Sequence, residues 1–339
     1  MAATIDDLEA LIARAGVPGA SIGFVNSGRL ELRSAGVVDT ATRVAVNDQT
    51  VFDAASLSKP VFAYAVLQLI EAGHLSLETK LSTLVPEYVS DDPRAEEVTV
   101  GQVLCHSSGL PNWRSVEFPL RTHFAPGERF SYSGEGYIWL QRVAERIMND
   151  PLEALMGKLV FQPLGMKQSS YLWQSAYEAN YAAPHDRAQQ PGLKRKPQQA
   201  MAAFSLHTTA GDYARFLQAV LTSANLRAGT AALWLVPHAS VRRPGILSLR
   251  PDGADADTGV SWGLGWGLEP ARGTFFQWGD SDRGRHKTFA MGSASEQKAL
   301  VILANGTQGM AIVPELVEGV FPGEHLCFEW LGYERLPRG

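Results

Sequence analysis

The sequence predicts an α+β fold, an α/β sandwich in which an antiparallel sheet built from the N- and C-terminal segments is flanked by helices and carries an inserted all-helical lobe. Strand-like runs gather near the N-terminus and again after residue 260, and the segment between them is rich in helices and loops. Strands at both ends with helices between them are typical of such a layered fold. The 339 residues, 45% of them hydrophobic, are enough to fill two lobes.

The N-terminal part begins with a helix from about Ile5 to Ala15, where apolar residues recur at helical spacing. The stretch ASIGFVNSGRLELRSAGVVD then predicts two strands joined by a turn at Asn26-Ser27-Gly28. GASIG within it matches the G-x-S-x-G pattern of a nucleophile elbow, which requires a turn from strand into helix. Because the strand continues through Phe24 and Val25, we expect Ser21 to be an ordinary strand residue.

Helices dominate the middle of the chain. From Pro60, residues at helical spacing form one apolar face up to Gly73, where a C-terminal cap is expected. Residues 75–204 are predicted to be mostly short helices and loops, and a further helix is expected over 209–221. Strand-like runs follow in SWGLGWGLEP, GTFFQW, KTFAMG and KALVILANG, before a last helix near 312–321.

Composition argues against several classes of partner. The formal net charge of -5 and the mixed charges leave no basic face for nucleic acid. No apolar run reaches the ~20 residues of a membrane span, and MAATIDDLEALIARAG lacks the basic and then apolar layout of a signal peptide. We therefore expect a cytoplasmic protein with no nucleic-acid or membrane partner, unless a leader peptide was removed.

Cysteines and histidines give no sign of a metal site. Cys105 and Cys327 have no C-x-x-C spacing and lie in apolar surroundings, so we expect buried free thiols. The histidines include no H-E-x-x-H and no paired spacing. We expect His106 and His207 to be hydrogen-bonded structural residues, and we expect neither a metal nor another cofactor.

Ser56 and Lys59 stand three residues apart in FDAASLSKPVFA, at the start of a predicted helix. Positions i and i+3 share a helix face, so the hydroxyl and the amine can come within hydrogen-bond reach. Free N–H groups and the helix dipole at the first turn favour the negative charge that develops when a serine attacks a carbonyl. Burial would lower the pKa of Lys59 toward neutrality and make its amine a base. A second match, Ser295 to Lys298, leads into a strand and loses the shared face.

Tyr132 lies in FSYSGEGY, a turn rich in glycine and serine from which a phenol can reach into a cleft and relay a proton. An aromatic that anchors a loop to the core is the alternative. The order SLSK, YSG and WGD resembles the serine β-lactamase and penicillin-binding-protein superfamily, whose motifs are S-x-x-K, Y-x-N and K-T-G, or H-x-G and W-G-G in esterase relatives. LCHSSGL, FQPLGM and SLHTTAGDYARF look like framework segments of its class C β-lactamase-like branch.

This resemblance covers nearly the whole chain and implies a β-lactamase/transpeptidase-like fold. We expect residues 1–60 and 205–339 to form the α/β lobe and residues 61–204 the mainly helical lobe, together making one catalytic unit. The resemblance implies that Ser56 is the acylated nucleophile, Lys59 its general base and Tyr132 a second proton carrier. It also implies an oxyanion hole from the backbone N–H groups of Ser56 and Ser281.

Departures from the family pattern concern the substrate. Gly134 stands where the family usually has an asparagine that hydrogen-bonds the substrate's amide side chain. Trp278 replaces a lysine that helps hold the substrate carboxylate in β-lactamases and peptidases, and an indole cannot hold an anion in that way. Both departures argue against β-lactams and peptidoglycan peptides, and they resemble the W-G-G pattern of family VIII carboxylesterases. Gly279 and Asp280 complete the expected substrate-binding motif.

Asp280 replaces the last glycine of that pattern, and a carboxylate beside Lys59 would raise the lysine pKa. We expect Asp280 to pair with Arg283 or Arg285. In an alternative register Lys287-Thr288-Phe289 is the third motif, but Phe289 would block the close backbone approach that a glycine permits.

Several other residues carry weaker signals. Glu135 could face the cleft and select cationic substrates, although a solvated loop carboxylate is the simpler expectation. The run Lys194-Arg195-Lys196 is most simply a solvated loop. Four tryptophans either line the cleft or fill the core, and the sequence favours neither: Trp113, Trp173, Trp262 and Trp266.

The sequence thus predicts a carboxylesterase-like serine hydrolase that acts on small esters through an acyl-enzyme. A D-amino acid amidase or aminopeptidase, an acyltransferase and a weak β-lactamase are the alternatives among enzymes. A catalytically inactive binding protein is the alternative from another class. The expected partner is a small-molecule ester or amide, and the chain is expected to be a monomer or a homodimer.

Overall fold

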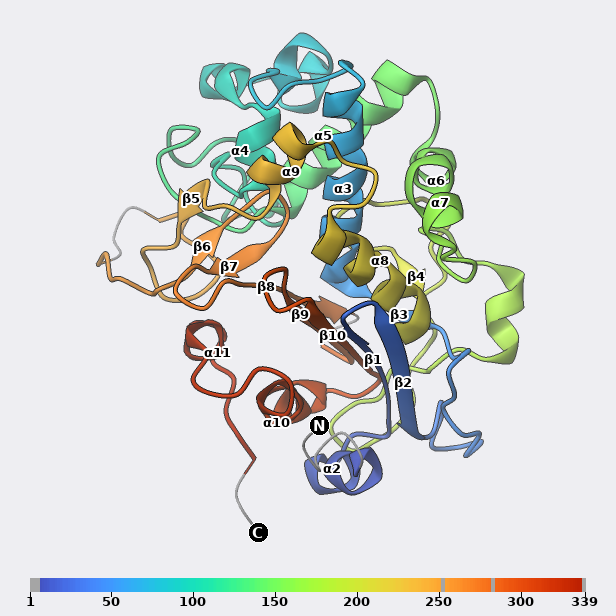
Figure 1. Cartoon of the computed structure of the whole chain (residues 1–339). Coiled ribbons are helices and arrows are strands. Elements are labelled where there is room, and N and C mark those ends of the chain that lie inside the picture. Colours follow the sequence, from blue (N-terminus) through green and yellow to red (C-terminus); the bar gives the residue numbers. More distant parts are fainter. Residues whose placement is uncertain (1–6, 251–253, 282–283, 337–339) are drawn as a thin grey trace.

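The computed structural model describes residues 7–250, 254–281 and 284–336. At its centre lies an eight-stranded sheet in the order β2-β1-β10-β9-β8-β7-β6-β5, in which neighbouring strands run antiparallel (Figure 1). Strands β1 and β2 come from the N-terminal part of the chain, and the other six follow residue 238. The prediction of an antiparallel sheet built from both ends of the chain is confirmed.

The strands of this sheet are β1 Gly19–Asn26, β2 Arg29–Gly36, β5 Ala239–Ser240, β6 Ser261–Trp262, β7 Gly267–Glu269, β8 Thr274–Ser281, β9 His286–Ser293 and β10 Lys298–Ala304. A separate two-stranded sheet pairs β3 Phe52–Asp53 with β4 His207–Thr208. The described α-helices are α2 Leu8–Ala15, α3 Ser58–Glu71, α4 Val100–Leu104, α5 Gly134–Met148, α6 Leu152–Met156, α7 Gln162–Leu164, α8 Ala210–Thr222, α9 Ala228–Trp234, α10 Val313–Glu318 and α11 Leu326–Leu331.

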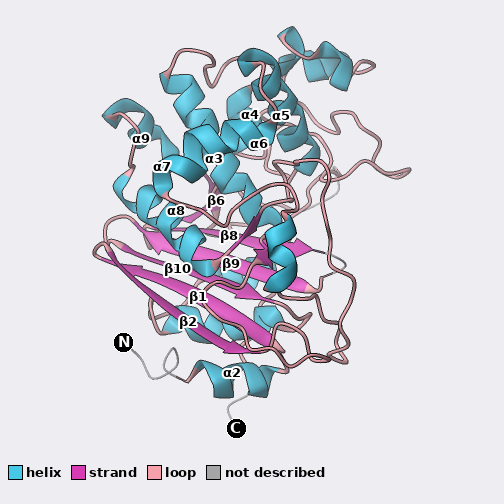
Figure 2. Cartoon of the chain, turned by 90° about the vertical axis from the view of Figure 1, so that its right-hand side faces the viewer, coloured by secondary structure: helices cyan, strands magenta, loops and turns pink. Residues whose placement is uncertain are grey.

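Helices cover both faces of the sheet (Figure 2). Helices α3 and α8 lie on one face, and α2, α10 and α11 lie on the other (Figure 1). Because successive side chains of a strand point to opposite faces, one strand supplies two cores. In β10, Ala299, Val301 and Leu303 enter the core shared with α3 and α8, whereas Leu300, Ile302 and Ala304 enter the core shared with α2 and α10.

Helix α3 is buried almost all round, so the prediction of one apolar face understated its burial. Eleven of its fourteen residues are buried, including Lys59. Two buried tyrosines fix its N-terminal end: Tyr171 donates to the carbonyl of Ser58 at 2.7 Å, and Tyr213 donates to the carbonyl of Leu57 at 3.1 Å. The segment around Ser56 is therefore held in the interior between the sheet and the helices.

Other expectations are resolved by the structure. Cys105 and Cys327 are buried free thiols, as predicted. Ser21 lies within β1, and its hydroxyl is 3.0 Å from that of Ser34, so it is a strand residue. Helix α5 is fifteen residues long, although the sequence predicted mostly short helices there. The lobe boundaries at residues 60 and 205 stay a prediction. None of the described helices has the length and apolar character that crossing a bilayer requires.

A buried glutamate connects the C-terminal helix to the sheet. Glu269 in β7 lies 2.7 Å from His325 Nδ1, accepts the N–H of Cys327 at 3.1 Å and accepts the hydroxyl of Thr274 at 2.8 Å. The carboxylate, the imidazole and the thiol of Cys327 lie within 4.8 Å of one another, a grouping that the sequence analysis did not detect. Burial acts to raise the pKa of Glu269, but these hydrogen bonds hold it below its ordinary value.

We expect Glu269→Ala to lower the free energy of unfolding by about 3 kcal/mol, because it leaves Nδ1 of the buried His325 without its carboxylate partner. Since the pKa of Glu269 is depressed, this contribution is present at neutral pH and is lost as the pH falls below about 4.3. Chemical denaturation at pH 7 measures the loss, and Glu329→Ala on the exposed side of α11 is the matched control. Equal denaturation midpoints for the two variants would contradict the expectation.

Candidate active site

Ser56 lies in a 3₁₀ turn, Ala55–Leu57, directly before α3. Ala55 has a left-handed φ of 49°, which is uncommon for a residue with a side chain. The Ala55 N–H donates to Asp53 Oδ1 at 2.9 Å, and the Ser58 hydroxyl donates to the Ala55 carbonyl at 2.5 Å. Buried polar groups thus hold the strained backbone that presents Ser56.

Lys59 reaches back along the helix face to Ser56, as the i and i+3 spacing predicted. Its Nζ lies 3.1 Å from Ser56 Oγ and donates to the carbonyl of Ala203 at 2.7 Å. The side chain is 1% exposed, and burial lowers the pKa of Lys59 to about 7. In a substantial fraction of the molecules, the Lys59 amine is therefore uncharged at neutral pH.

Tyr132 lies immediately before α5 and is buried, and its ring centroid is 4.7 Å from Lys59 Nζ. Burial raises the pKa of the phenol, and this effect outweighs the lowering by its hydrogen bonds with Ser56 and Gln277. Tyr132 is therefore a neutral phenol that can donate and accept a proton in a relay. The structure brings Ser56, Lys59 and Tyr132 together, as the sequence predicted.

Strand β8 passes close to the turn that carries Ser56, and Gly279 permits this approach. A Cβ atom at Gly279 would lie 2.7 Å from the carbonyl oxygen of Ala54 and 2.2 Å from Thr288 Oγ1. The Thr288 hydroxyl itself donates a hydrogen bond to the Ala54 carbonyl at 2.9 Å. Ser281, at the end of β8, lines the same pocket as Ser56, where the oxyanion hole is expected.

Asp280 pairs with Lys287 on the neighbouring strand at 2.5 Å. A pairing with Arg283 or Arg285 was expected; among the described residues the partner is Lys287 and not Arg285, and Arg283 lies outside the described residues. The pKa of Lys59 is lowered by burial, and the Asp280 carboxylate does not raise it. Lys287, Thr288 and Phe289 belong to β9, and the pocket is lined from β8 instead, so the alternative register is not favoured.

Trp113 occupies the space beside Gly134. A Cβ atom at Gly134 would lie 2.6 Å from the Trp113 ring and 2.8 Å from the carbonyl oxygen of Asn112. The N–H of Gly134 donates to Asn112 Oδ1 at 3.0 Å. Indole and backbone therefore fill the position from which the asparagine of the family pattern would extend.

The pocket around Ser56 has a volume of about 370 Å³. Its aromatic and apolar lining comes from Trp113, Tyr132, Phe204, Ile246 and Trp278. Its polar lining comes from Ser56, Asn112, Arg195, Asp280 and Ser281. Of the four unassigned tryptophans, Trp113 thus lines the cleft, Trp262 and Trp266 are fully buried, and Trp173 packs against Tyr177 and Tyr181.

Two predictions about charged residues were wrong. Glu135 neither faces the cleft nor lies in a solvated loop: it is a buried residue of α5 that accepts hydrogen bonds from Arg114 and Tyr88. Arg195 is not simply solvated, because it lines the pocket and pairs with the buried Asp53 at 3.2 Å. The partners of both residues are distant in sequence.

Gln277 is a site residue that sequence reasoning missed. Its Nε2 donates to the Tyr132 hydroxyl at 2.8 Å and lies 3.4 Å from the carbonyl oxygen of Ser56. The only signal in the sequence is its place directly before Trp278. His106 is structural, as predicted: its Nδ1 accepts the N–H of Ser133 at 3.0 Å, and its ring lies 4.2 Å from that of Tyr132.

A half-buried serine in contact with a buried lysine, beside a neutral tyrosine on this α+β fold, defines the class of serine hydrolases with a β-lactamase fold. The chain belongs to the Beta-lactamase family, which it matches over residues 4–318.

Curated relatives include both penicillin-binding proteins and esterases. Penicillin-binding protein 4 of Amycolatopsis lactamdurans is 28% identical over 74% of this chain and 71% of its own length. Esterase EstB of Burkholderia gladioli is 30% identical over 47% of this chain and 48% of its own length. Lovastatin esterase of Penicillium rubens is 27% identical over 62% of this chain and 68% of its own length.

Solved structures share the fold at low identity. A class C beta-lactamase has a TM-score of 0.75 at 19% identity, over 95% of this chain and 96% of that one. The octameric penicillin-binding protein homologue from Pyrococcus abyssi has a TM-score of 0.75 at 21% identity, over 94% of this chain and 77% of that one. These likenesses agree with the predicted fold class.

Proposed function

We propose that the chain hydrolyses small carboxylic esters through an acyl-enzyme on Ser56. The observation that carries the proposal is the contact of 3.1 Å between Ser56 Oγ and the amine of Lys59, whose pKa burial lowers to about 7. An uncharged amine at this distance can take the serine proton at neutral pH.

The reaction divides into two halves. Ser56 Oγ bonds to the ester carbonyl carbon while Lys59 takes its proton, and the backbone N–H groups of Ser56 and Ser281 hold the oxyanion. The C–O bond to the alcohol then breaks, and the alcohol leaves with a proton passed from Lys59 through the Tyr132 phenol. Water attacks the acyl-enzyme with the same groups in the same roles, which releases the carboxylic acid and restores Ser56.

Esters are favoured over β-lactams by the lining of the pocket. Trp278, on β8, offers a ring where a lysine would hold a substrate carboxylate, and Trp113 fills the space beside Gly134. Two of the similar proteins are named esterases, which is consistent with this choice. The amidase alternative rested on an acidic pocket, and Glu135 and Asp280 are both paired with cations.

The proposal is tested with a fluorophosphonate probe and a substrate panel. We expect the wild-type protein to gain one adduct, located on Ser56 by peptide mass spectrometry. Ser56→Ala should gain none, and Ser21→Ala, the matched control, should be labelled like the wild type. An adduct on another residue would overturn the assignment of the nucleophile.

The panel compares kcat/KM for short p-nitrophenyl esters, D-amino acid p-nitroanilides and nitrocefin. We expect the esters to give the highest value. A higher kcat/KM on nitrocefin would show that Trp278 does not exclude β-lactams. Added alcohol or amine acceptors distinguish hydrolysis from acyl transfer, because a transferase forms the new ester or amide in preference to the acid.

A further inference from the structure

Arg195 brings a guanidinium into the wall of the pocket that holds Ser56. It belongs to the loop between His185 and β4, whereas the third motif lies on β8. It therefore reaches the pocket from a different element than Trp278.

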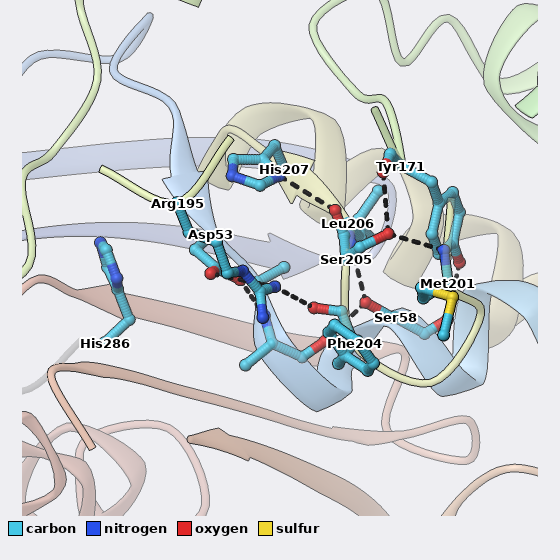
Figure 3. A network of polar contacts seen from close by, with 12 residues as sticks. Asp53, Ser58, Tyr171, Arg195, Met201, Phe204, Ser205, Leu206, His207 and His286 are labelled. Atoms are coloured by element: carbon cyan, nitrogen blue, oxygen red, sulfur yellow. Dashed lines mark hydrogen bonds and ion pairs between the residues drawn. The ribbon is translucent and has the colours of Figure 1, made fainter. Parts of the chain in front are cut away.

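The guanidinium is anchored through one nitrogen. Nη2 donates to the Phe204 carbonyl at 2.8 Å and lies 3.2 Å from Asp53 Oδ2, as the network in Figure 3 shows. Its Cζ lies 4.8 Å from the centroid of the Phe204 ring. Two charge-assisted contacts and an aromatic ring thus fix where the planar group points.

Asp53 is fully buried and stays ionised. Burial acts to raise the pKa of Asp53, but Arg195, His207, His286 and the Ala55 N–H together hold it below its ordinary value. The same carboxylate that holds the turn before Ser56 therefore positions Arg195.

Part of Arg195 remains available for a ligand. The donor left for a ligand is Nη1, because none of residues 7–250, 254–281 and 284–336 accepts a hydrogen bond from it, whereas Nη2 is engaged and Nε is buried. The side chain is 31% exposed, and the residue lines the cavity. A rigid, anchored guanidinium with unused donors is suited to a carboxylate.

The other charged residue in the described pocket lining is Asp280, and Lys287 pairs with its carboxylate. An anion near Arg195 would therefore not meet an uncompensated negative charge. The rest of the wall near Arg195 is aromatic, with Phe204 against Trp113 at 5.3 Å between ring centroids. Such a wall suits the carbon skeleton of an organic acid better than a free inorganic ion.

We propose that the substrate is an ester that also carries a carboxylate and that Arg195 binds this group. The inference rests on the proposed esterase function and names its substrate class. A purely structural role, in which Arg195 only neutralises Asp53, is the competing explanation. A structural role would affect neutral and anionic esters alike, whereas binding of the carboxylate affects only the anionic ones.

The test measures kcat/KM on two matched pairs of esters. The first pair places the carboxylate in the acyl group, with p-nitrophenyl butyrate against the mono-p-nitrophenyl ester of glutaric acid. The second pair places it in the alcohol, with phenyl acetate against 4-carboxyphenyl acetate. We expect Arg195→Gln to lower the anionic-to-neutral ratio about 10-fold or more in one pair, which also tells which side of the ester carries the anion.

Lys196→Gln is the matched control, because it removes an equal charge from the same loop but from a side chain that pairs with Glu178 outside the pocket lining. We expect it to leave both ratios within about twofold of the wild type. If Arg195→Gln does not yield folded protein, Arg195→Lys serves, since it keeps the charge near Asp53 but loses the planar fork. Arg195→Lys is then expected to lower the same ratio several-fold.

A second readout does not depend on turnover. Glutarate is expected to slow fluorophosphonate labelling of Ser56 in the wild type, and this protection should weaken in Arg195→Gln. Unchanged ratios and unchanged protection would overturn the inference while esters are still hydrolysed. Failure of the proposed function would look different, because the wild type would then turn over neither member of either pair.

Discussion

Replacing Lys59 with methionine is expected to lower kcat/KM on short esters about 10³-fold, which lies within the range that a positioned general base contributes. The amine is the group within 3.1 Å of Ser56 Oγ, and methionine fills a similar space without a lone pair to accept the proton. Lys167→Met, at an exposed position, is the matched control and should retain wild-type kcat/KM. Retention of more than a tenth of wild-type activity by Lys59→Met would exclude Lys59 as the base.

The pH dependence of the same variant follows from the lowered lysine pKa. Since the uncharged amine is the active form, wild-type kcat/KM should rise as the pH increases through about 7. In the unfolded chain a lysine titrates near 10.4, so between about pH 7 and 10 the unfolded state binds more protons and the free energy of unfolding rises with pH. Lys59→Met should be more stable than the wild type at pH 7 and should lose this part of the pH dependence.

Substituting alanine at Gly279 is expected to lower kcat about 10²-fold, the size of effect seen when one oxyanion donor is lost. The new Cβ would meet Thr288 Oγ1 and the backbone oxygen of Ala54, so β8 would have to move away from the turn that carries Ser56. The N–H of Ser281, two residues further along β8, would then be displaced from the position proposed for the oxyanion hole. KM should change much less than kcat, because the loss concerns the transition state.

Gly229→Ala in α9 is the control for this substitution, because no atom lies within 4 Å of the added Cβ. It should leave kcat unchanged and raise the free energy of unfolding by about 0.5 kcal/mol. Single-turnover kinetics and a denaturation curve for both variants measure the two quantities, the rate of the chemical step and the free energy of unfolding. A Gly279→Ala protein with wild-type kcat would show that close packing of β8 on Ala54 is not needed.

The local sequence pattern was sufficient to predict the pair of residues at the centre of the site, Ser56 and Lys59. Ser56 and Lys59 are three residues apart, so helical geometry alone brings their polar atoms together. Apolar periodicity likewise located α3, the turn at Asn26-Ser27-Gly28 indicated the pairing of β1 with β2, and a strand-like apolar run located β10. The family resemblance then supplied Tyr132 and the strand β8, which no local rule connects to Ser56.

What the sequence did not reveal depends on contacts between distant residues. Arg195 lies on the pocket because Asp53, far away along the chain, pairs with it. Glu135 is buried because Arg114 and Tyr88 surround its carboxylate. The segment that begins α5 contains Gly134 and Gly136, which favour a turn by propensity, yet packing against the core keeps it helical.

The indole of Trp113 beside Gly134 also constrains how this protein could change over evolutionary time. Introducing an asparagine at position 134 alone would drive its Cβ into the indole and the backbone of Asn112. Replacing Trp113 would remove the first of these clashes but would leave the second, because the carbonyl oxygen of Asn112 belongs to the backbone. Directed conversion of this scaffold therefore needs both a smaller residue at position 113 and a shift of the loop that carries Asn112 before the asparagine can be accommodated.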